Sequence, residues 1–121
     1  MAALLIGPKH VFELANPLYC QMMGRSDIVG KAYSDAFPRL AAGLLELLDR
    51  VYDTGEPFAT DEFRLSFDRG RGGVEECFFR INLEPVNDSR GEVYGIMSVA
   101  VEITDQVLDR QRLEKAHRDR E

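Results

Sequence analysis

Residues of the types that carry out chemistry are few in this sequence, and they stand apart. The histidines are His10 and His117, near opposite ends of the chain, and the cysteines are Cys20 and Cys77, in apolar surroundings. Metal sites and disulfide frameworks are usually marked by closely spaced pairs of such residues. The sequence therefore predicts no metal site and reduced thiols, with Cys20 as a buried structural cysteine.

The carboxylates and the glycines also give no catalytic pattern. The 21 Asp and Glu residues fall mainly on the polar sides of predicted helices and in turns, where solvated surface charge is expected. The glycine-rich stretch 68–73 joins two predicted strands instead of opening a helix, which favours a mobile hairpin loop over a phosphate-binding loop. Because spacing brings no nucleophile, acid and base together, we expect a non-catalytic domain.

Composition and charge narrow the class of protein. The chain has 121 residues, 45% hydrophobic and 30% charged, which is typical of one soluble domain. Its net charge of -6 disfavours nucleic-acid binding, because contacts with phosphates need a basic surface. The apolar runs are shorter than a membrane span, and the first residues lack the basic start of a secretory signal. We therefore expect a cytoplasmic protein that does not insert into membranes.

The first half of the chain reads as a hairpin followed by helices. Residues 2–6 and 10–15 flank a turn at 7–9, and Asn16 and Pro17 predict the start of a helix that ends near Gly24. Irregular turns follow through residue 38, where some apolar side chains can tuck inward: Ile28, Val29, Tyr33 and Phe37. The clearest helix covers 40–54, and its apolar stripe consists of Leu40, Leu44, Leu47, Leu48 and Val51.

The second half reads as three strands joined by hairpins. Residues 58–67 and 78–83 alternate between apolar and polar positions, and 87–91 form a turn before a last strand at 93–104. Both alternating sets of that last strand are largely apolar, so we expect helices against one face and a partner or another segment against the other. A charged helix follows from about Thr104 without a glycine or proline, which predicts that strand and helix move as one unit. The fold class is α+β with an antiparallel sheet.

This order of elements and several local motifs resemble the PAS domain. The stretch 10–19 resembles the family's second strand and its Asn-Pro helix start, and 24–31 resembles the Gly-Arg and Gly-Lys segment that follows. Residues 84–86, 88–91 and 95–96 resemble the fourth strand, its turn and the fifth strand. Residues 102–104 stand where signalling relatives carry Asp-Ile-Thr or Asp-Val-Thr before an output helix. The resemblance extends from about residue 3 to 113 and is closest to PAS modules of bacterial and archaeal sensor histidine kinases.

The resemblance implies an architecture and a role. It implies a PAS fold, with a five-stranded antiparallel sheet and flanking short helices, as a sensory core at 1–104, and the start of a signalling or coiled-coil helix at 105–121. It assigns signal transmission to Glu102, Ile103 and Thr104, and it implies a homodimer whose output domain, a kinase or similar, follows in the same chain of a two-component system. His117 lacks the adjacent acidic residue of a phosphoacceptor motif, so we expect a surface histidine.

A pocket between sheet and helices is common in the family, and the residues that could converge on it serve equally well as plain core. The candidates are Tyr19, Met22, Met23, Phe37, Leu44, Leu48, Phe63, Phe79, Ile81 and Met97. Haem-binding relatives take an axial histidine from the long helix, and the helix at 40–54 has none, so the resemblance disfavours haem. Covalent flavin is disfavoured because Cys20 lies on an earlier helix than the cysteine of flavin-binding relatives. No cofactor is predicted, and any ligand is expected to be small and apolar or weakly polar.

Two other functions stay open at this point. One is a ligand-free dimerisation module, in which the exposed face of the sheet pairs with a second copy. The other is a small α+β enzyme with its site in the curved sheet, for which the sequence offers no preferred residue.

Overall fold

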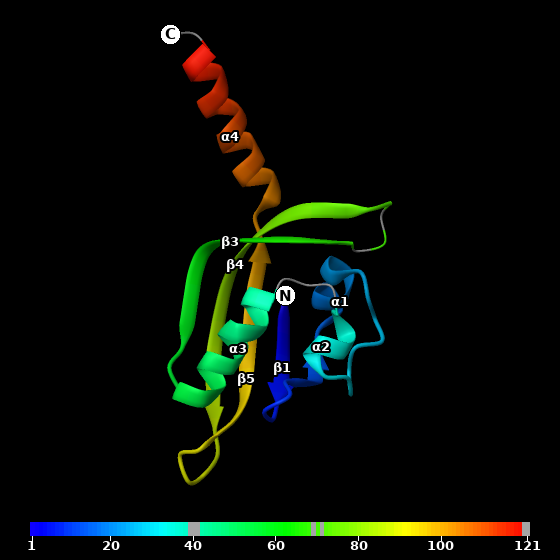
Figure 1. Ribbon diagram of the computed structural model, residues 1–121, viewed down its shortest axis with the longest axis vertical. Coiled ribbons are helices and arrows are strands. Elements are labelled where there is room, and N and C mark those ends of the chain that lie inside the picture. The colour runs from blue at the N-terminus through cyan, green and yellow to red at the C-terminus, as the bar shows by residue number, and fades with distance from the viewer. Residues whose placement is uncertain (39–41, 69, 71, 120–121) are drawn as a thin grey trace.

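The computed structural model describes residues 1–38, 42–68, 70 and 72–119. Its centre is a five-stranded antiparallel sheet with the strand order β2-β1-β5-β4-β3 (Figure 1). The strands are β1 (Ala2–Ile6), β2 (Val11–Ala15), β3 (Phe58–Asp68), β4 (Val74–Asn87) and β5 (Val93–Glu102). The helices are α1 (Pro17–Met23), α2 (Tyr33–Ala36), α3 (Ala42–Thr54) and α4 (Thr104–Asp119). The predicted α+β fold with its N-terminal hairpin, helices and three-strand meander is confirmed.

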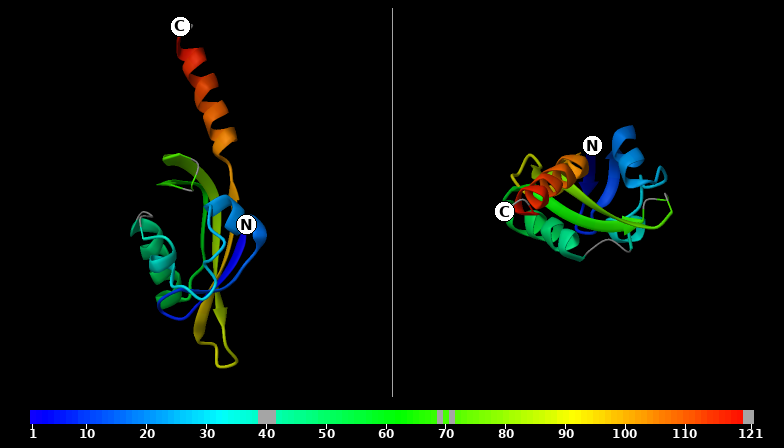
Figure 2. Two further views of the ribbon diagram at one scale, coloured as in Figure 1. Left: turned by 90° about the vertical axis from the view of Figure 1, so that its right-hand side faces the viewer. Right: turned by 90° about the horizontal axis from the view of Figure 1, so that it is seen from above.

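One face of the sheet packs against the helices, whereas α4 leaves the sheet and projects away from it (Figures 1 and 2). The core joins side chains of α1, α2 and α3 to inward residues of all five strands. Of the predicted apolar stripe on α3, Leu44, Leu48 and Val51 are buried, and Leu40 lies outside the described residues. None of the described helices is long and apolar enough to cross a membrane.

β5 occupies the middle of the sheet, between β1 and β4. Of its inward residues, Ile96 and Ala100 are buried, at 0% and 6% exposure, and Ser98 is half-buried. Its outward set is open, with Val99 at 44% and Val101 at 53% exposure. The predicted helix cover of one face is therefore confirmed, and the opposite apolar face is left uncovered by the described part of this chain.

Local capping fixes where α1 begins and ends. The Asn16 side-chain oxygen accepts hydrogen bonds from the Tyr19 backbone N–H at 2.8 Å and from that of Ala2 at 3.1 Å, so one residue caps the helix and ties it to β1. Gly24 ends the helix in the left-handed conformation at φ 77°, which glycine adopts without steric cost. Both ends were predicted from the residue types.

Gly95 is needed where β5 pairs with β1, opposite Ile6. A Cβ atom at this position would lie 2.8 Å from the Leu5 carbonyl oxygen and 2.9 Å from the Ile6 Cδ1 atom. The Leu5 oxygen is a backbone atom and cannot turn aside as a side chain could. A Cβ at this position would therefore push β5 and β1 apart, which would weaken the hydrogen bonds between them.

We predict that Gly95→Ala lowers the free energy of unfolding by about 1–3 kcal/mol through this overpacking. Denaturant titration monitored by circular dichroism measures the change. Gly43→Ala on α3 is the matched control, because none of the described atoms lies within 4 Å of its added Cβ and alanine favours a helix. Equal stability of Gly95→Ala and the wild type would show that the close approach is absent.

Candidate functional site

A cavity of about 30 Å³ lies between the sheet and the helices. Its lining is mostly apolar, and the described lining residues with polar side-chain groups are Ser98, Tyr19 and Tyr33. The lining residues are Met1, Leu5, Tyr19, Met23, Tyr33, Leu44, Leu48, Leu65, Phe79, Ile81, Leu83, Ser98 and Ala100. A space of this size holds a water molecule or a very small ligand.

The structure brings six of the ten predicted pocket residues to this cavity. They are Tyr19, Met23, Leu44, Leu48, Phe79 and Ile81. Helical spacing explains the first four, because residues four apart share one face of α1 or α3. Strand alternation explains the last two, because inward positions of β4 recur at every second residue.

The other four candidates lie elsewhere. Phe37 lines a groove beside the cavity, and Phe63 is half-buried and packs against the core. Met22 lies one residue before Met23 on α1 and lines a polar groove at the base of α4. Met97 faces outward from β5, because the inward positions of that strand are 96, 98 and 100, and it lines a shallow depression on the outer face.

Several lining residues were not among the predicted pocket residues. Ser98 and Ala100 are small members of the inward set of β5, and they pair in register with Leu83 and Ile81 of β4. Small side chains opposite large ones leave space between the sheet and the helices. The alternation of β5, which puts Ser98 and Ala100 on one face, could therefore have identified them as lining residues. Tyr33 was recognised only as a residue that could tuck inward.

An aromatic cluster fixes α1 and α2 over β2. The Phe12 ring centroid lies 5.7 Å from that of Tyr19, 6.0 Å from Tyr33 and 6.0 Å from Phe37. Burial raises the pKa of the Tyr19 phenol well above its usual value, with a smaller contribution from Cys20. Burial also raises the pKa of Tyr33, with a smaller contribution from Tyr19. Both phenols therefore stay protonated at physiological pH and can donate hydrogen bonds.

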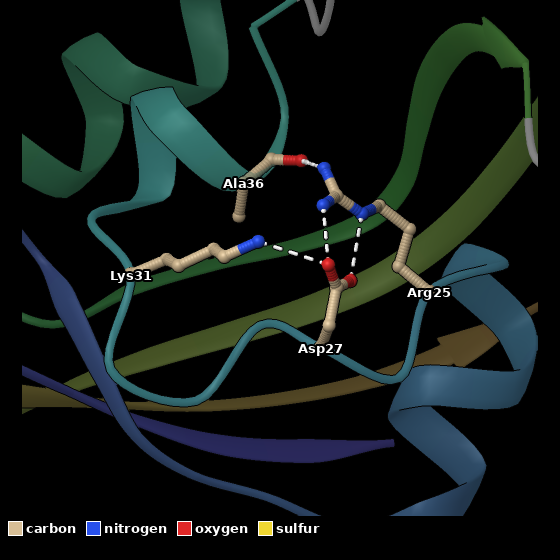
Figure 3. A network of polar contacts seen from close by, with 4 residues as sticks. All are labelled: Arg25, Asp27, Lys31 and Ala36. Atoms are coloured by element: carbon tan, nitrogen blue, oxygen red, sulfur yellow. Dashed lines mark hydrogen bonds and ion pairs between the residues drawn. The ribbon is translucent and has the colours of Figure 1, made fainter.

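A charged network closes the segment between α1 and α2 (Figure 3). Arg25 binds Asp27 through Nε at 3.1 Å and Nη2 at 3.0 Å, and Lys31 Nζ binds the same carboxylate at 2.9 Å. The remaining Arg25 nitrogen, Nη1, donates to the Ala36 carbonyl oxygen at the end of α2. These bonds hold the pKa of Asp27 well below its usual range. The Gly-Arg and Gly-Lys motif of this segment thus supplies a clamp on the loop.

A buried histidine joins the first hairpin to α3. His10 is 1% exposed, and its Nε2 atom lies 2.7 Å from Asp49 Oδ1. Its ring also meets that of Tyr52 edge-on at 5.9 Å. Sequence reasoning placed His10 beside a turn and Asp49 on the polar side of the helix, but it gave no signal that the two meet. Cys20, expected to be buried, is half-buried, while Cys77 is buried.

Two hydrogen bonds of the Phe78 backbone fix the junction between β5 and α4 to β4. The Ile103 N–H donates to the Phe78 carbonyl oxygen at 2.8 Å, and the Phe78 N–H donates to Thr104 Oγ1 at 3.0 Å. The Thr104 hydroxyl in turn donates to Glu102 Oε2 at 2.6 Å. Val107 in the first turn of α4 is 2% exposed. The three residues assigned to signal transmission therefore meet at one point, beside the Phe79 that lines the cavity.

The site carries no sign of metal chemistry in the residues that are described. No group of three or more His, Cys, Asp or Glu residues among them could hold a metal ion. Phe79, which lines the cavity, and Phe78, which binds the base of α4, are adjacent residues of β4.

Comparison with known proteins supports the fold. A family model described as the PAS fold matches residues 1–108. The chain is similar to an RNA-binding light-oxygen-voltage receptor, with a TM-score of 0.71 and 16% identity over 96% of this chain and 33% of that chain. It is also similar to the light state of the blue-light photoreceptor Aureochrome1 LOV, with a TM-score of 0.66 and 12% identity over 95% of this chain and 90% of that chain. At these identities the structural likeness shows the fold alone, and the chain spans about a third of the first receptor.

A further similar structure is a light-oxygen-voltage domain studied with a flavin analogue. It has a TM-score of 0.66 and 12% identity, over 99% of this chain and 87% of that chain. The predicted five-stranded PAS-type architecture is confirmed by these matches together with the strand order.

We predict that Asp27→Asn destabilises the domain at pH 7 and that this difference shrinks as the pH falls below about 4. The folded-state pKa of Asp27 is lowered, so its contribution is present above the unfolded-state pKa of about 4 and is lost as the pH falls toward the folded-state pKa. Urea titrations of wild type and variant between pH 2 and pH 7 measure the difference. Glu13→Gln, at an exposed position of β2, is the control for removing one surface carboxylate. A difference that is independent of pH would contradict the role given to the ionised Asp27.

Proposed function

The chain belongs to the PAS-fold family, and from that membership we propose that it is the sensory and signal-transmission module of a larger signalling protein. The observation that carries the proposal is the adjacency of Phe79 and Phe78 on β4. Phe79 lines the cavity, whereas the backbone of Phe78 binds Ile103 and Thr104 at the base of α4. A change in the position of Phe79 at the cavity wall would therefore act on the residue next to it, Phe78, which anchors the output helix.

The proposed mechanism is a shift between two packing states of the sheet. Binding of a ligand or partner moves the paired inward residues of β4 and β5, such as Ile81 with Ala100. The movement reaches Phe78 and Glu102 along the same two strands and changes the tilt or rotation of α4. Residues 1–104 then form the sensory core, and 105–121 begin the signalling helix. The proposed parent is a histidine kinase of a two-component system, whose output domain follows α4 in the same chain, and the isolated domain is non-catalytic.

We predict that a Gly-Gly insertion after Thr104 makes the output of the longer protein insensitive to its signal, because it separates α4 from the hydrogen bonds that fix its base. The measurement compares the output activity of the longer protein with and without signal. A Gly-Gly insertion after Ser89 in the exposed β4–β5 turn is the matched control, and it is expected to leave signalling intact. Signalling that survives the insertion after Thr104 would refute transmission through this junction.

RNA binding and a flavin analogue appear in the names of two similar structures, and they describe those proteins alone. For this chain we propose neither a covalent flavin nor haem. The cavity of about 30 Å³ is far below the roughly 300–1,000 Å³ of ordinary ligand pockets, and the described lining residues include neither cysteine nor histidine. Cys20 instead lines a surface depression and Cys77 the groove at the base of α4. The net charge of -6 supports a partner other than nucleic acid.

The outer sheet face supports a second role, pairing with another copy of the chain. The apolar residues of this face are Leu4, Leu14, Met97, Val99 and Val101, and the outward residues of β4 beside them are polar. Leu4 pairs in register with Leu14 on one side and Met97 on the other, so their side chains share one surface. Leu14 is 62% exposed and Val101 is 53% exposed. Adjoining exposed apolar side chains of this kind are typical of an interface between chains.

We predict that the wild-type domain is a dimer in solution and that Val99→Lys weakens the dimer by more than about tenfold, because it places a charge at the centre of the outer sheet face. Size-exclusion chromatography with light scattering over a concentration series measures the effect. Val74→Lys is the matched control, since Val74 is 74% exposed at the start of β4, away from this face. A wild-type monomer at every concentration, or a dimer unchanged by Val99→Lys, would exclude this interface.

A further inference from the structure

The hydroxyl group of Tyr33 is a buried donor that no described residue pairs with. Tyr33 is 4% exposed, and its hydroxyl oxygen has no hydrogen-bond partner among the residues that the structure describes. Native proteins leave few such groups, because an unpaired buried hydroxyl loses its hydrogen bonds to water without replacement. Tyr33 lines the cavity, so the missing acceptor has a place next to it.

The ring of Tyr33 is held in position by its surroundings. Its centroid lies 6.0 Å from that of Phe12 and 5.6 Å from that of Phe37. Its backbone N–H donates to the His10 carbonyl oxygen at 2.9 Å, which fixes the start of α2 to the first hairpin. A donor fixed in this way cannot turn to bulk solvent, so its acceptor has to be a water molecule or a ligand atom inside the cavity.

The chemistry of the wall selects a neutral acceptor. The described lining residues include no Lys, Arg or His side chain, and the Met1 ammonium group donates to the Ala100 carbonyl oxygen at 2.9 Å, so a carboxylate or phosphate in the cavity would meet no cationic side chain. Burial keeps the Tyr33 phenol protonated, with its pKa well above the usual value, so it donates at every physiological pH. A carbonyl, ester or similar oxygen satisfies it, and the apolar wall accommodates a hydrocarbon body.

The flexible side chain of Met23 lies between the cavity and a larger groove. Met23 lines the cavity and also an adjacent groove of about 230 Å³. The groove lies between the α1–α2 segment and the β3–β4 hairpin, and its rim includes Arg25 and Ala36, which Figure 3 shows joined to each other. Methionine is unbranched and adapts its shape easily, so a change of its rotamer connects the two spaces.

We propose that this site binds a small neutral organic molecule with one carbonyl-type oxygen, which accepts a hydrogen bond from Tyr33 while its apolar body extends past Met23 into the groove. The inference rests on the proposed sensory function and specifies the class of ligand that the cavity recognises. The groove and the cavity together provide room that the cavity alone does not.

Two probe compounds of nearly equal shape test the proposal, acetophenone and isopropylbenzene, of which only the first carries an acceptor oxygen. Binding to the wild type, Tyr33→Phe and Tyr94→Phe is measured by nuclear magnetic resonance titration. We expect acetophenone to bind the wild type, and Tyr33→Phe to weaken that binding about five- to tenfold, as for the loss of one hydrogen bond. Isopropylbenzene should bind the wild type and Tyr33→Phe equally. Tyr94→Phe changes a tyrosine that is 42% exposed and does not line the cavity, and it should behave as the wild type.

The melting temperatures of the ligand-free proteins supply a second readout. Because Tyr33→Phe removes only an unpaired oxygen, it should raise the melting temperature, and a lower one would show that the hydroxyl is already paired. Failure of acetophenone to bind the wild type, equal acetophenone affinity in wild type and Tyr33→Phe, or equal loss for both probes would each overturn the proposal. These outcomes leave the sensory function standing if the insertion after Thr104 still abolishes signalling, so the two failures are distinguishable.

Discussion

The structure depends on the way in which the backbone of Phe78 holds the base of α4. Its carbonyl oxygen accepts from Ile103 and its N–H donates to Thr104, so a single residue of β4 fixes both the end of β5 and the start of the helix. Val107 is buried beyond this point, whereas Leu113 further along α4 is 72% exposed. An isolated helix of this length is marginal in water, so its orientation is set mainly at its base. In the proposed mechanism, a change at that base reorients the helix.

The cavity, and the contacts that hold the helices over it, lie next to this anchor. The segment over the cavity is held by Arg25, Asp27 and Lys31 on the outside and by the aromatic cluster around Phe12 on the inside. α3 is tied to the first hairpin through His10 and Asp49. In the proposed mechanism, the helical side is held at these points, and a molecule that enters the cavity displaces β4 and β5.

Sequence reasoning succeeded where local rules decide the structure. Asn16, Pro17 and Gly24 fixed α1, and the spacing of Leu44, Leu48 and Val51 fixed the inner face of α3. It failed where contacts join distant segments, as for His10 with Asp49 or the outward side of Met97, because strand alternation gives two faces without saying which one meets the helices. The volume of the cavity follows from packing among many side chains, and no residue pattern gives it.

Backbone amide chemical shifts at the helix base test the central claim most directly. Leu48→Val trims the cavity wall from α3, on the opposite side of the cavity from the sheet, and Glu46→Ala changes an exposed position of the same helix. Coupling through the sheet predicts that Leu48→Val shifts the amide resonances of Phe78, Ile103 and Val107, whereas Glu46→Ala leaves them in place. Shift changes that stop at the residues lining the cavity would contradict transmission from the cavity to α4.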